Sequence, residues 1–454
     1  MKKWTIPEKK EKYMKNIIHG YLPEERPPFG KLVLFALQQI LVMFPATVLV
    51  ALLTGFHVST TIFASGFATI VFIFITKGKI PLYYGSSFSY LAPIMGITMA
   101  KFGVPAGDVL ISQVQFGIIL SGFVSIAAGL IVNYYGAEKI EKLLPPTITG
   151  SIAIVIGLSL AGTAMSSASG YDATTGLTNN AAWIVALITL VSTIIFSVYL
   201  KGVWSQLPIL LGILVGYIVS IFFNMVDFGV ILNGGIVSVP HFTLPTISWP
   251  AVFAIMPIAI ATIPESTAHL FQLDIYVNDL AKRKGAAEQK IADKLGLNLI
   301  GDGIGDIVAG FIGGPAGTNY GENLSTMAIT KNFSVWVLGA AAILAMVFSF
   351  FAPITNFVLT FPAPVINGAS IYLFGVIGAQ GIAIMINKKV DLFDSRNLAL
   401  IAVVLTIGLG GSYVFPNGMI PFFGIKLPAI ASASVFGILL NFILSFKKTT
   451  TDIE

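Results

Sequence analysis

Long apolar runs separated by short polar segments fill the sequence between Lys31 and Lys447. Most runs contain about 17 to 25 residues, the length that an α-helix needs to cross a lipid bilayer. The pattern therefore predicts an all-α polytopic membrane protein. We predict fourteen spans: residues 31–53, 60–76, 83–101, 109–133, 146–164, 181–199, 206–224, 250–271, 295–313, 319–331, 333–352, 363–385, 397–412 and 425–445.

The composition excludes a soluble domain. Of the 454 residues, 56% are hydrophobic and 10% charged, against roughly 25% charged residues in a typical soluble domain. Residues 1–30 are polar and basic, so we expect a cytoplasmic tail rather than a signal peptide there, and a second tail at residues 447–454. Cysteine is absent, there are four histidines, and no His-Glu-x-x-His pattern occurs. We therefore predict no disulfide, no metal site and no cofactor.

Basic residues alternate between the two sides of the predicted membrane domain. All but two of the 26 Lys and Arg residues fall in the tails and the even-numbered loops, the exceptions being Lys101 and Lys426. This asymmetry predicts that both termini are cytoplasmic. It also explains the net charge of +5 without a nucleic-acid partner, while binding of anionic lipid by the basic tail is the alternative.

Two short patterns recur after seven spans. Residues 84–89 in the third span (Tyr-Gly-Ser-Ser-Phe-Ser) resemble residues 320–325 in the tenth (Tyr-Gly-Glu-Asn-Leu-Ser). Because seven is odd, the second half would cross the membrane upside down relative to the first, which is the inverted-repeat plan of many secondary transporters. The second pattern relates the fifth and twelfth spans: Pro146, Gly150 and Gly157 have the same spacing as Pro364, Gly368 and Gly375.

The third and tenth spans are also the most interrupted by Pro and Gly, with Pro81 and Gly85 in one and five such residues between Gly313 and Gly321 in the other. Broken segments at corresponding positions of two halves mark a transporter binding site. We predict short extended stretches at residues 86–90 and 318–322, each leading into a half-helix whose N–H groups point at the ligand. Helix packing through small residues is the alternative.

Two glutamates lie inside apolar surroundings, Glu265 in the eighth span and Glu322 in the tenth. An ionisable side chain at this depth costs at least about 2.5 kcal/mol, which indicates a function. Glu265 and His269 are four residues apart and share one helical face. They can act together in proton coupling, since a buried carboxyl group can exchange a proton while it binds a ligand. A purely structural pair is the alternative.

Glu322 stands between Gly321 and Asn323 at the start of the tenth half-helix. A carboxylate, an amide and free backbone N–H groups together suit a small planar ligand with alternating donors and acceptors, a pattern that nucleobases have. Capping of the half-helix by Glu322 is the alternative.

Two further acids, Asp302 and Asp306, share a face of the ninth span. They would either belong to a cation or proton path or bond the backbone freed at the tenth span. Phe88 and Phe374 are candidates to stack on a ring, although packing is the commoner role of a phenylalanine. Gln39 in the first span is expected to bond a neighbouring helix.

These motifs resemble the nucleobase/ascorbate transporter family, most closely its bacterial uracil permease branch. The family signature is an acidic or amide residue, Asn-x-Gly, four variable positions, Thr, and a basic residue or Gly; residues 322–331 match it, except that Ser325 replaces the glycine. The segments 37–39, 43–50, 85–88 and 318–323 are similar to the permeases too. The resemblance covers nearly the whole chain.

The resemblance implies a core domain (31–135 and 250–352) and a gate domain (145–225 and 360–446), with the substrate between them. It implies that Glu265 and Glu322 hydrogen-bond a pyrimidine, that His269 supports Glu265, and that Phe88, Gly321 and Ala46 line the site. Several residues depart from the family pattern and bear on the substrate and coupling ion: Gln39 in place of a usual His, Pro45 and Pro264 in place of small residues, Phe374 in place of a gate tyrosine, and the extra acid Asp306.

The expected function is proton-coupled import of uracil or a related nucleobase across a bacterial cytoplasmic membrane, by movement of the core against the gate. A Na⁺-coupled mechanism and a homodimer stay open. A xanthine or purine permease, or an anion transporter like the sulfate permeases, is the alternative, although two acids at the site would repel an anion unless both were protonated. An enzyme is not expected, because no nucleophile or metal set surrounds Glu265 and His269.

Overall fold

The computed structural model describes residues 20–136, 144–172, 174–231, 235–422 and 425–445. Of the two predicted tails, residues 1–19 and 447–454 lie outside the described residues. The described part of the first tail runs along residues 331–333, where the N–H of Tyr21 bonds the carbonyl of Lys331 and the N–H of Phe333 bonds the carbonyl of Tyr21.

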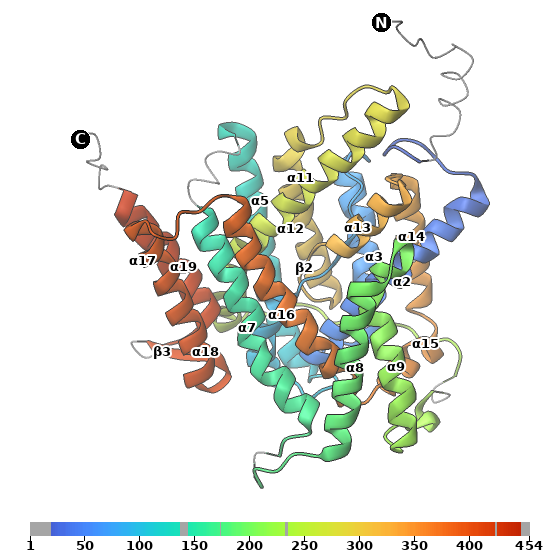
Figure 1. Cartoon of the computed structure of the whole chain (residues 1–454), viewed down its shortest axis with the longest axis vertical. Coiled ribbons are helices and arrows are strands. Elements are labelled where there is room, and N and C mark those ends of the chain that lie inside the picture. The colour runs from blue at the N-terminus through green and yellow to red at the C-terminus, as the bar shows by residue number, and fades with distance from the viewer. Residues whose placement is uncertain (1–19, 137–143, 173, 232–234, 423–424, 446–454) are drawn as a thin grey trace, which may run out of the picture.

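The fold is mostly helical (Figure 1). Among the described residues, nine helical segments are long and apolar enough to cross a membrane, which confirms the predicted class, and four apolar helices are shorter. The first half contains α2 (Phe29–Thr54), α3 (Val58–Ile75), β1 (Tyr84–Ser86), η1 (Phe88–Tyr90), α4 (Leu91–Thr98), α5 (Asp108–Tyr135), α7 (Pro146–Ser169), α8 (Asn180–Tyr199), η2 (Gly202–Gln206) and α9 (Pro208–Phe222).

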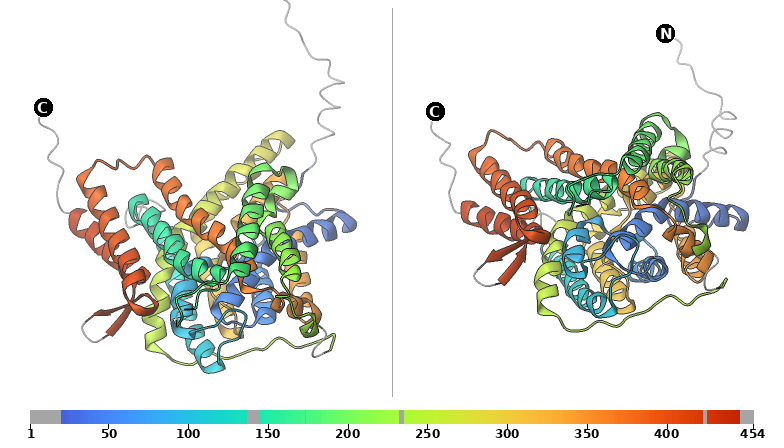
Figure 2. Two further views of the ribbon diagram at one scale, coloured as in Figure 1. Left: turned by 60° about the horizontal axis from the view of Figure 1, so that its bottom comes forward. Right: turned by 90° about the horizontal axis from the view of Figure 1, so that it is seen from below.

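An extended linker that includes the short turn η3 (Phe228–Val230) leads into the second half and crosses the molecule in both views of Figure 2. The second half contains α10 (Trp249–Ile255), η4 (Met256–Ile258), α11 (Ala259–Lys284), η5 (Ala292–Lys294), α12 (Leu295–Ile312), β2 (Gly317–Asn319), α13 (Gly321–Thr330), α14 (Val335–Phe348), α15 (Ala352–Leu359), α16 (Ala363–Asn387), α17 (Ser395–Leu405), the π-helical turn η6 (Thr406–Gly410), α18 (Gly411–Val414), η7 (Pro416–Gly418), β3 (Met419–Phe422), β4 (Ile425–Pro428) and α19 (Ala429–Ser445).

Several predicted boundaries are wrong. The span predicted at 425–445 begins as a strand, because β4 pairs with β3 in an antiparallel hairpin and helix starts only at Ala429. The span predicted at 250–271 continues as helix to Lys284, since its polar second half remains helical after the apolar run ends. Of the extended stretches predicted at 86–90 and 318–322, only Ser86 and residues 318–319 belong to strands, which begin earlier, at Tyr84 and Gly317. Phe88–Tyr90 is a 3₁₀ turn, and Gly321 already starts a helix.

The closest packing occurs within two groups of helices. One group packs α5 with α12 and α10, and α3 with α12 and α14; the other packs α7 with α16 and α17, and α8 with α9 and α16. In the right-hand view of Figure 2, the green, orange and red helices of the second group lie along the top and left of the molecule.

Glycines bring paired helices into backbone contact. A Cβ atom on Gly303 of α12 would lie 2.4 Å from the carbonyl oxygen of Gly122 on α5, and one on Gly122 would lie equally close to the carbonyl of Gly303. Gly150 of α7 and Gly381 of α16 have the same reciprocal relation, at 2.7 and 2.4 Å. Only residues without a side chain allow this approach, which is the packing that small residues provide in membranes.

We therefore expect Gly303→Ala to destabilise the protein by about 1 to 3 kcal/mol, because the added methyl group overpacks a rigid backbone contact. The matched control is Gly339→Ala in α14, where an added Cβ meets nothing within 4 Å. Thermal denaturation of both variants in detergent measures the effect. Equal stability of Gly303→Ala and the control would contradict the close backbone contact.

Candidate functional site

Two short antiparallel strands lie buried among the helices and organise the site. Tyr84 pairs with Asn319, Gly85 with Thr318 and Ser86 with Gly317. The pairing continues at both ends, because the N–H of Ser87 bonds the carbonyl of Ala316 and the N–H of Tyr320 bonds the carbonyl of Tyr83. The two interrupted segments that the sequence singled out are therefore joined to each other.

Each strand runs directly into a half-helix. The chain leaves β1 through η1 into α4, and it leaves β2 into α13, whose N-cap is Tyr320. Because the strands are antiparallel, the two half-helices begin at opposite ends of the strand pair and run away from it. Their first N–H groups, which have no partner within the helix, are thus gathered in the interior.

Both glutamates lie at this junction. Glu322 is in the first turn of α13. Glu265 lies on the neighbouring helix α11, where its carboxyl group interacts with the hydroxyl of Ser89 in η1 and with the charge of Glu322. Both glutamates are partly exposed, whereas the adjacent Ser266 and Asn323 are buried. The structure therefore brings Glu265 and Glu322 together beside the two half-helix starts.

His269 follows Glu265 by one turn of α11 and reaches the same region. Its Nε2 atom would lie 2.8 Å from a Cβ on Gly321, and the ring lies beside the backbone of Asn319. Its buried Nδ1 atom has no hydrogen-bond partner among the described residues. Gly321 therefore provides the space that the imidazole occupies.

Asn323 and Ala46 connect the site to α2. The side-chain amide of Asn323 donates to the carbonyl of Gln39 at 3.0 Å and to its Oε1 at 2.7 Å, which is the helix-to-helix bond expected for Gln39. Ala46 is buried on α2, and its neighbour Thr47 shares a hydrogen bond of 3.0 Å with the Tyr320 hydroxyl. Asn323 thus holds the second half-helix against α2.

Asp306 bonds the broken backbone. Its Oδ1 accepts a hydrogen bond of 2.8 Å from the N–H of Gly317 in β2 and one of 2.5 Å from the hydroxyl of Tyr84 in β1. Of the two roles weighed from the sequence, these bonds favour the satisfaction of freed backbone. Asp306 therefore links α12 to both strands.

Asp302 belongs to a separate set of polar side chains. It accepts hydrogen bonds from Ser266 and from the amide of Asn319, the latter at 3.2 Å. Asn298 donates to Ser266 at 2.7 Å and accepts from Asn319 at 3.2 Å. The other carboxylate oxygen of Asp302, Oδ1, is buried without a hydrogen-bond partner among the described residues.

The two candidate aromatic residues differ in position. Phe88 opens η1 and is partly exposed, one residue before Ser89. Phe374 is buried on α16, and its carbonyl lies against Gly157 of α7. The structure therefore places Phe88 next to Ser89, which interacts with Glu265, and Phe374 in the packing of α7 against α16.

Sequence reasoning missed Ser266, Asn298, Asn319 and Tyr84 as parts of the site. One signal was available for Asn298, which precedes Asp302 by four residues and so shares its helical face. Ser266, Asn319 and Tyr84 adjoin residues that were recognised or recur in the repeat, but nothing in the sequence shows that they bond one another.

The chain matches known proteins over most of its length. A family model described as "Permease family" matches residues 30–417. The uracil permease of Bacillus caldolyticus is 36% identical over 93% of this chain and 94% of its own length. The uracil permease of Escherichia coli (strain K12) is 34% identical over 92% of each chain.

Solved structures share the fold at low sequence identity. The transmembrane domain of the cyanobacterial bicarbonate transporter BicA superposes with a TM-score of 0.56 at 13% identity, covering 92% of this chain and 97% of that one. The murine anion transporter Slc26a9 in its inward-facing state gives a TM-score of 0.64 at 12% identity, covering 100% of this chain and 76% of that one.

The apolar helices and the match to permeases over most of the chain thus define a membrane transporter rather than an enzyme. The chain belongs to the permease family. This confirms the resemblance, first seen in the sequence motifs, to the nucleobase/ascorbate transporters and their uracil permease branch.

Substitution of Asp306 separates its two proposed roles. Asp306→Ala leaves the Tyr84 hydroxyl and the Gly317 N–H without their acceptor, and each unsatisfied buried group costs about 1 to 3 kcal/mol. Asp306→Asn keeps an acceptor oxygen, so we expect it to retain most of the stability and transport. Thermal denaturation and substrate uptake measure both variants. Stable protein with transport abolished in Asp306→Asn would favour the ion-path role instead.

Proposed function

We propose that the protein imports uracil or a closely related nucleobase across the cytoplasmic membrane, coupled to protons, by movement of a core domain against a gate domain. The observation that carries this proposal is the convergence of Glu265 and Glu322 beside the starts of two half-helices. The uracil permeases that match the chain almost end to end support the substrate class.

The chemistry of the site suits a nucleobase. Each carboxylate oxygen accepts a hydrogen bond from a ring N–H group, and the N–H groups at the half-helix starts donate to ring carbonyls. Phe88, next to Ser89, offers an aromatic face for the ring. Two neighbouring ionised carboxyl groups repel an anion. We therefore do not propose an anion as the substrate, although an anion transporter shares the fold.

A xanthine or purine permease is the second candidate within the family. We prefer a pyrimidine because the matching relatives are named uracil permeases and because glutamate rather than glutamine stands at position 322, which resembles the uracil branch.

Proton coupling is proposed from the two neighbouring carboxyl groups. The protonation of one depends on the charge of the other, so proton binding and substrate binding at the two groups are linked. Asp302, with one oxygen free of partners among the described residues, is a second candidate on the proton path. His269 is proposed to position Glu265 and to reach the ligand through its unpartnered nitrogen.

The fourteen-span inverted repeat is supported by the contacts between helices. Every predicted span contains an observed helix. The α5–α12 pair joins spans four and nine, and a shift of seven spans turns it into the observed α14–α3 pair of spans eleven and two. The same shift turns α8–α9 into α17–α19, and α8–α16 into α17–α7. Such correspondence is expected of two halves related by a pseudo-two-fold axis.

The two helix groups correspond to the proposed domains. The group around α3, α5, α12 and α14 falls within the core ranges 31–135 and 250–352, and the group around α7, α8, α9 and α16 within the gate ranges 145–225 and 360–446. The alternation of basic loops supports cytoplasmic termini. Substrate access from alternate sides would follow from displacement of one group against the other.

The substrate role of the glutamates is tested by uptake of labelled uracil into cells. Glu322→Gln replaces an acceptor oxygen by a donor, and hydrogen bonds to charged groups contribute about 1.5 to 3 kcal/mol, so we expect uptake at low uracil to fall roughly 10- to 100-fold. Glu265→Gln should behave alike. The matched control is Glu288→Gln in the exposed loop after α11. Uptake equal to that of the control would exclude direct recognition by Glu322.

Coupling is tested separately in vesicles containing the purified protein. An imposed inward proton gradient should drive uracil above its external concentration, because the substrate and the proton enter together. An uncoupler should abolish this accumulation while equilibration continues, and replacement of Na⁺ by K⁺ should leave it unchanged. Accumulation that follows the Na⁺ gradient would show that sodium is the coupling ion.

A further inference from the structure

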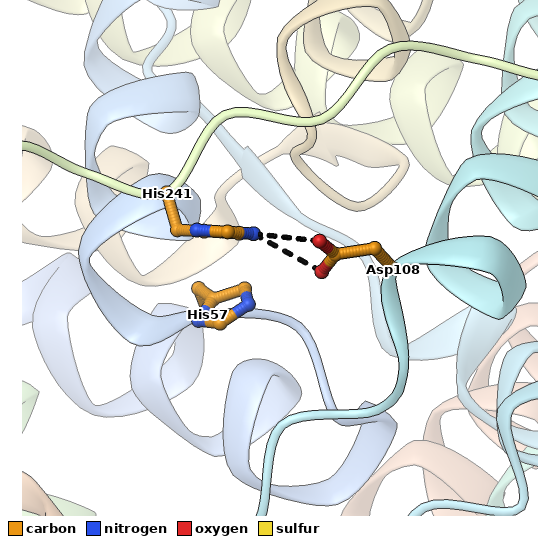
Figure 3. Close-up of side chains that lie close together, drawn as sticks. All are labelled: His57, Asp108 and His241. Carbon is orange, nitrogen blue, oxygen red and sulfur yellow. Dashed lines mark hydrogen bonds and ion pairs between the residues drawn. The ribbon is translucent and has the colours of Figure 1, made fainter.

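Two histidines and an aspartate that the transport site does not use lie close together (Figure 3). His57 lies between α2 and α3, Asp108 is in the first turn of α5, and His241 is in the linker between the two halves. One ligand atom of each lies within 4.8 Å of those of the other two.

The cluster contains one more side chain than a surface ion pair requires. The Nε2 atom of His241 lies 3.0 and 3.1 Å from the two carboxylate oxygens of Asp108. The rings of His57 and His241 are 4.3 Å apart between centroids and inclined at 41°. A solvent-exposed ion pair alone contributes at most about 1 kcal/mol, and it does not explain why a second imidazole adjoins the first.

The linker that carries His241 is fastened to the helices that carry or adjoin the other two residues. The carbonyl of His241 accepts a hydrogen bond of 2.7 Å from Thr60 of α3. Two residues on, Thr243 exchanges two hydrogen bonds of 2.8 Å with the side chain of Gln115 of α5. The N–H of Thr246 bonds the carbonyl of Ser112 at 3.0 Å. The linker backbone that carries His241 is therefore held against α3 and α5.

The donor set is that of a transition-metal site. Imidazole nitrogen and carboxylate oxygen are the ligands of Zn²⁺, whereas Ca²⁺ and Mg²⁺ prefer oxygen alone. Zinc holds such atoms about 2.0 to 2.2 Å from the ion, which puts them roughly 3.4 Å from one another. The three ligand atoms lie within 4.8 Å of one another, so small side-chain adjustments would bring them to this spacing. The His241 and Asp108 side chains are 49% and 59% exposed and are free to make this adjustment.

The surroundings leave room for an open coordination position. A cavity of about 370 Å³ adjoins the cluster and is lined by both histidines together with residues of α2 and α15. Three protein ligands would leave the fourth position of a tetrahedral ion facing water.

We propose that His57, Asp108 and His241 bind one transition-metal dication of the Zn²⁺ type, which fastens the inter-half linker to α3 and α5. If both termini are cytoplasmic, as proposed above, the metal site faces the outside of the cell. The binding itself does not depend on the transported substrate.

The test is a calorimetric titration of ZnCl₂ into the full chain, purified in detergent without a polyhistidine tag and without nucleobase. We expect one Zn²⁺ per chain, and the same titration with MgCl₂ should give no binding. His57→Ala and His241→Ala should each weaken zinc binding at least about tenfold, since each removes one of three ligands. His19→Ala is the matched control and should leave binding unchanged.

Each variant is first compared with the parent in its melting temperature without metal. Where alanine lowers this temperature, His57→Gln and His241→Gln replace it, with the same expected loss of binding. Zinc binding that is unchanged in the double variant His57→Gln/His241→Gln, or no binding to the parent chain below millimolar zinc, would overturn the proposal. Neither outcome bears on uracil transport, so the metal site and the transport function are tested independently.

Discussion

The structure depends on one constraint: a backbone that stops being helical inside a membrane must find hydrogen-bond partners in the protein. The β1–β2 pair supplies most of them by joining the two breaks to each other. Neighbouring helices supply the rest, with Ser65 and Thr69 of α3 donating to the carbonyl of Tyr84 and Asp306 of α12 accepting from Gly317. Because the breaks satisfy one another, two helix starts come to lie in the interior, where the glutamates adjoin them.

Features that depend on local composition are the ones that sequence predicts well. Apolar runs located the membrane helices, since a span must be both long and apolar whatever its neighbours are. Glycine and proline located the two breaks, because glycine weakens a helix through its conformational freedom and proline lacks the N–H group that a helix bonds. Glu265 and Glu322 stood out for the same reason, as charges where hydrocarbon is expected.

Features that depend on partners from elsewhere in the chain were not predictable. Asp306 has an ambiguous role until the N–H of Gly317 is placed against it. His57, Asp108 and His241 lie far apart in the sequence and form no metal-binding motif of short spacing, so the sequence predicted no metal site. Residues 425–428 adjoin the apolar run of the last predicted span, and their pairing with residues 419–422 is what makes them a strand rather than the start of the helix.

The glycine contacts between helices also bear on what the protein must keep from crossing the membrane. Where Gly122 faces Gly303, and where Gly150 faces Gly381, there is no room for a methyl group between the backbones. The backbones touch each other directly there, so no water molecule or hydrated ion fits between them at these contacts. At these points the seams between α5 and α12 and between α7 and α16 are closed to leakage of protons and sodium, the ions whose gradients a cell must conserve.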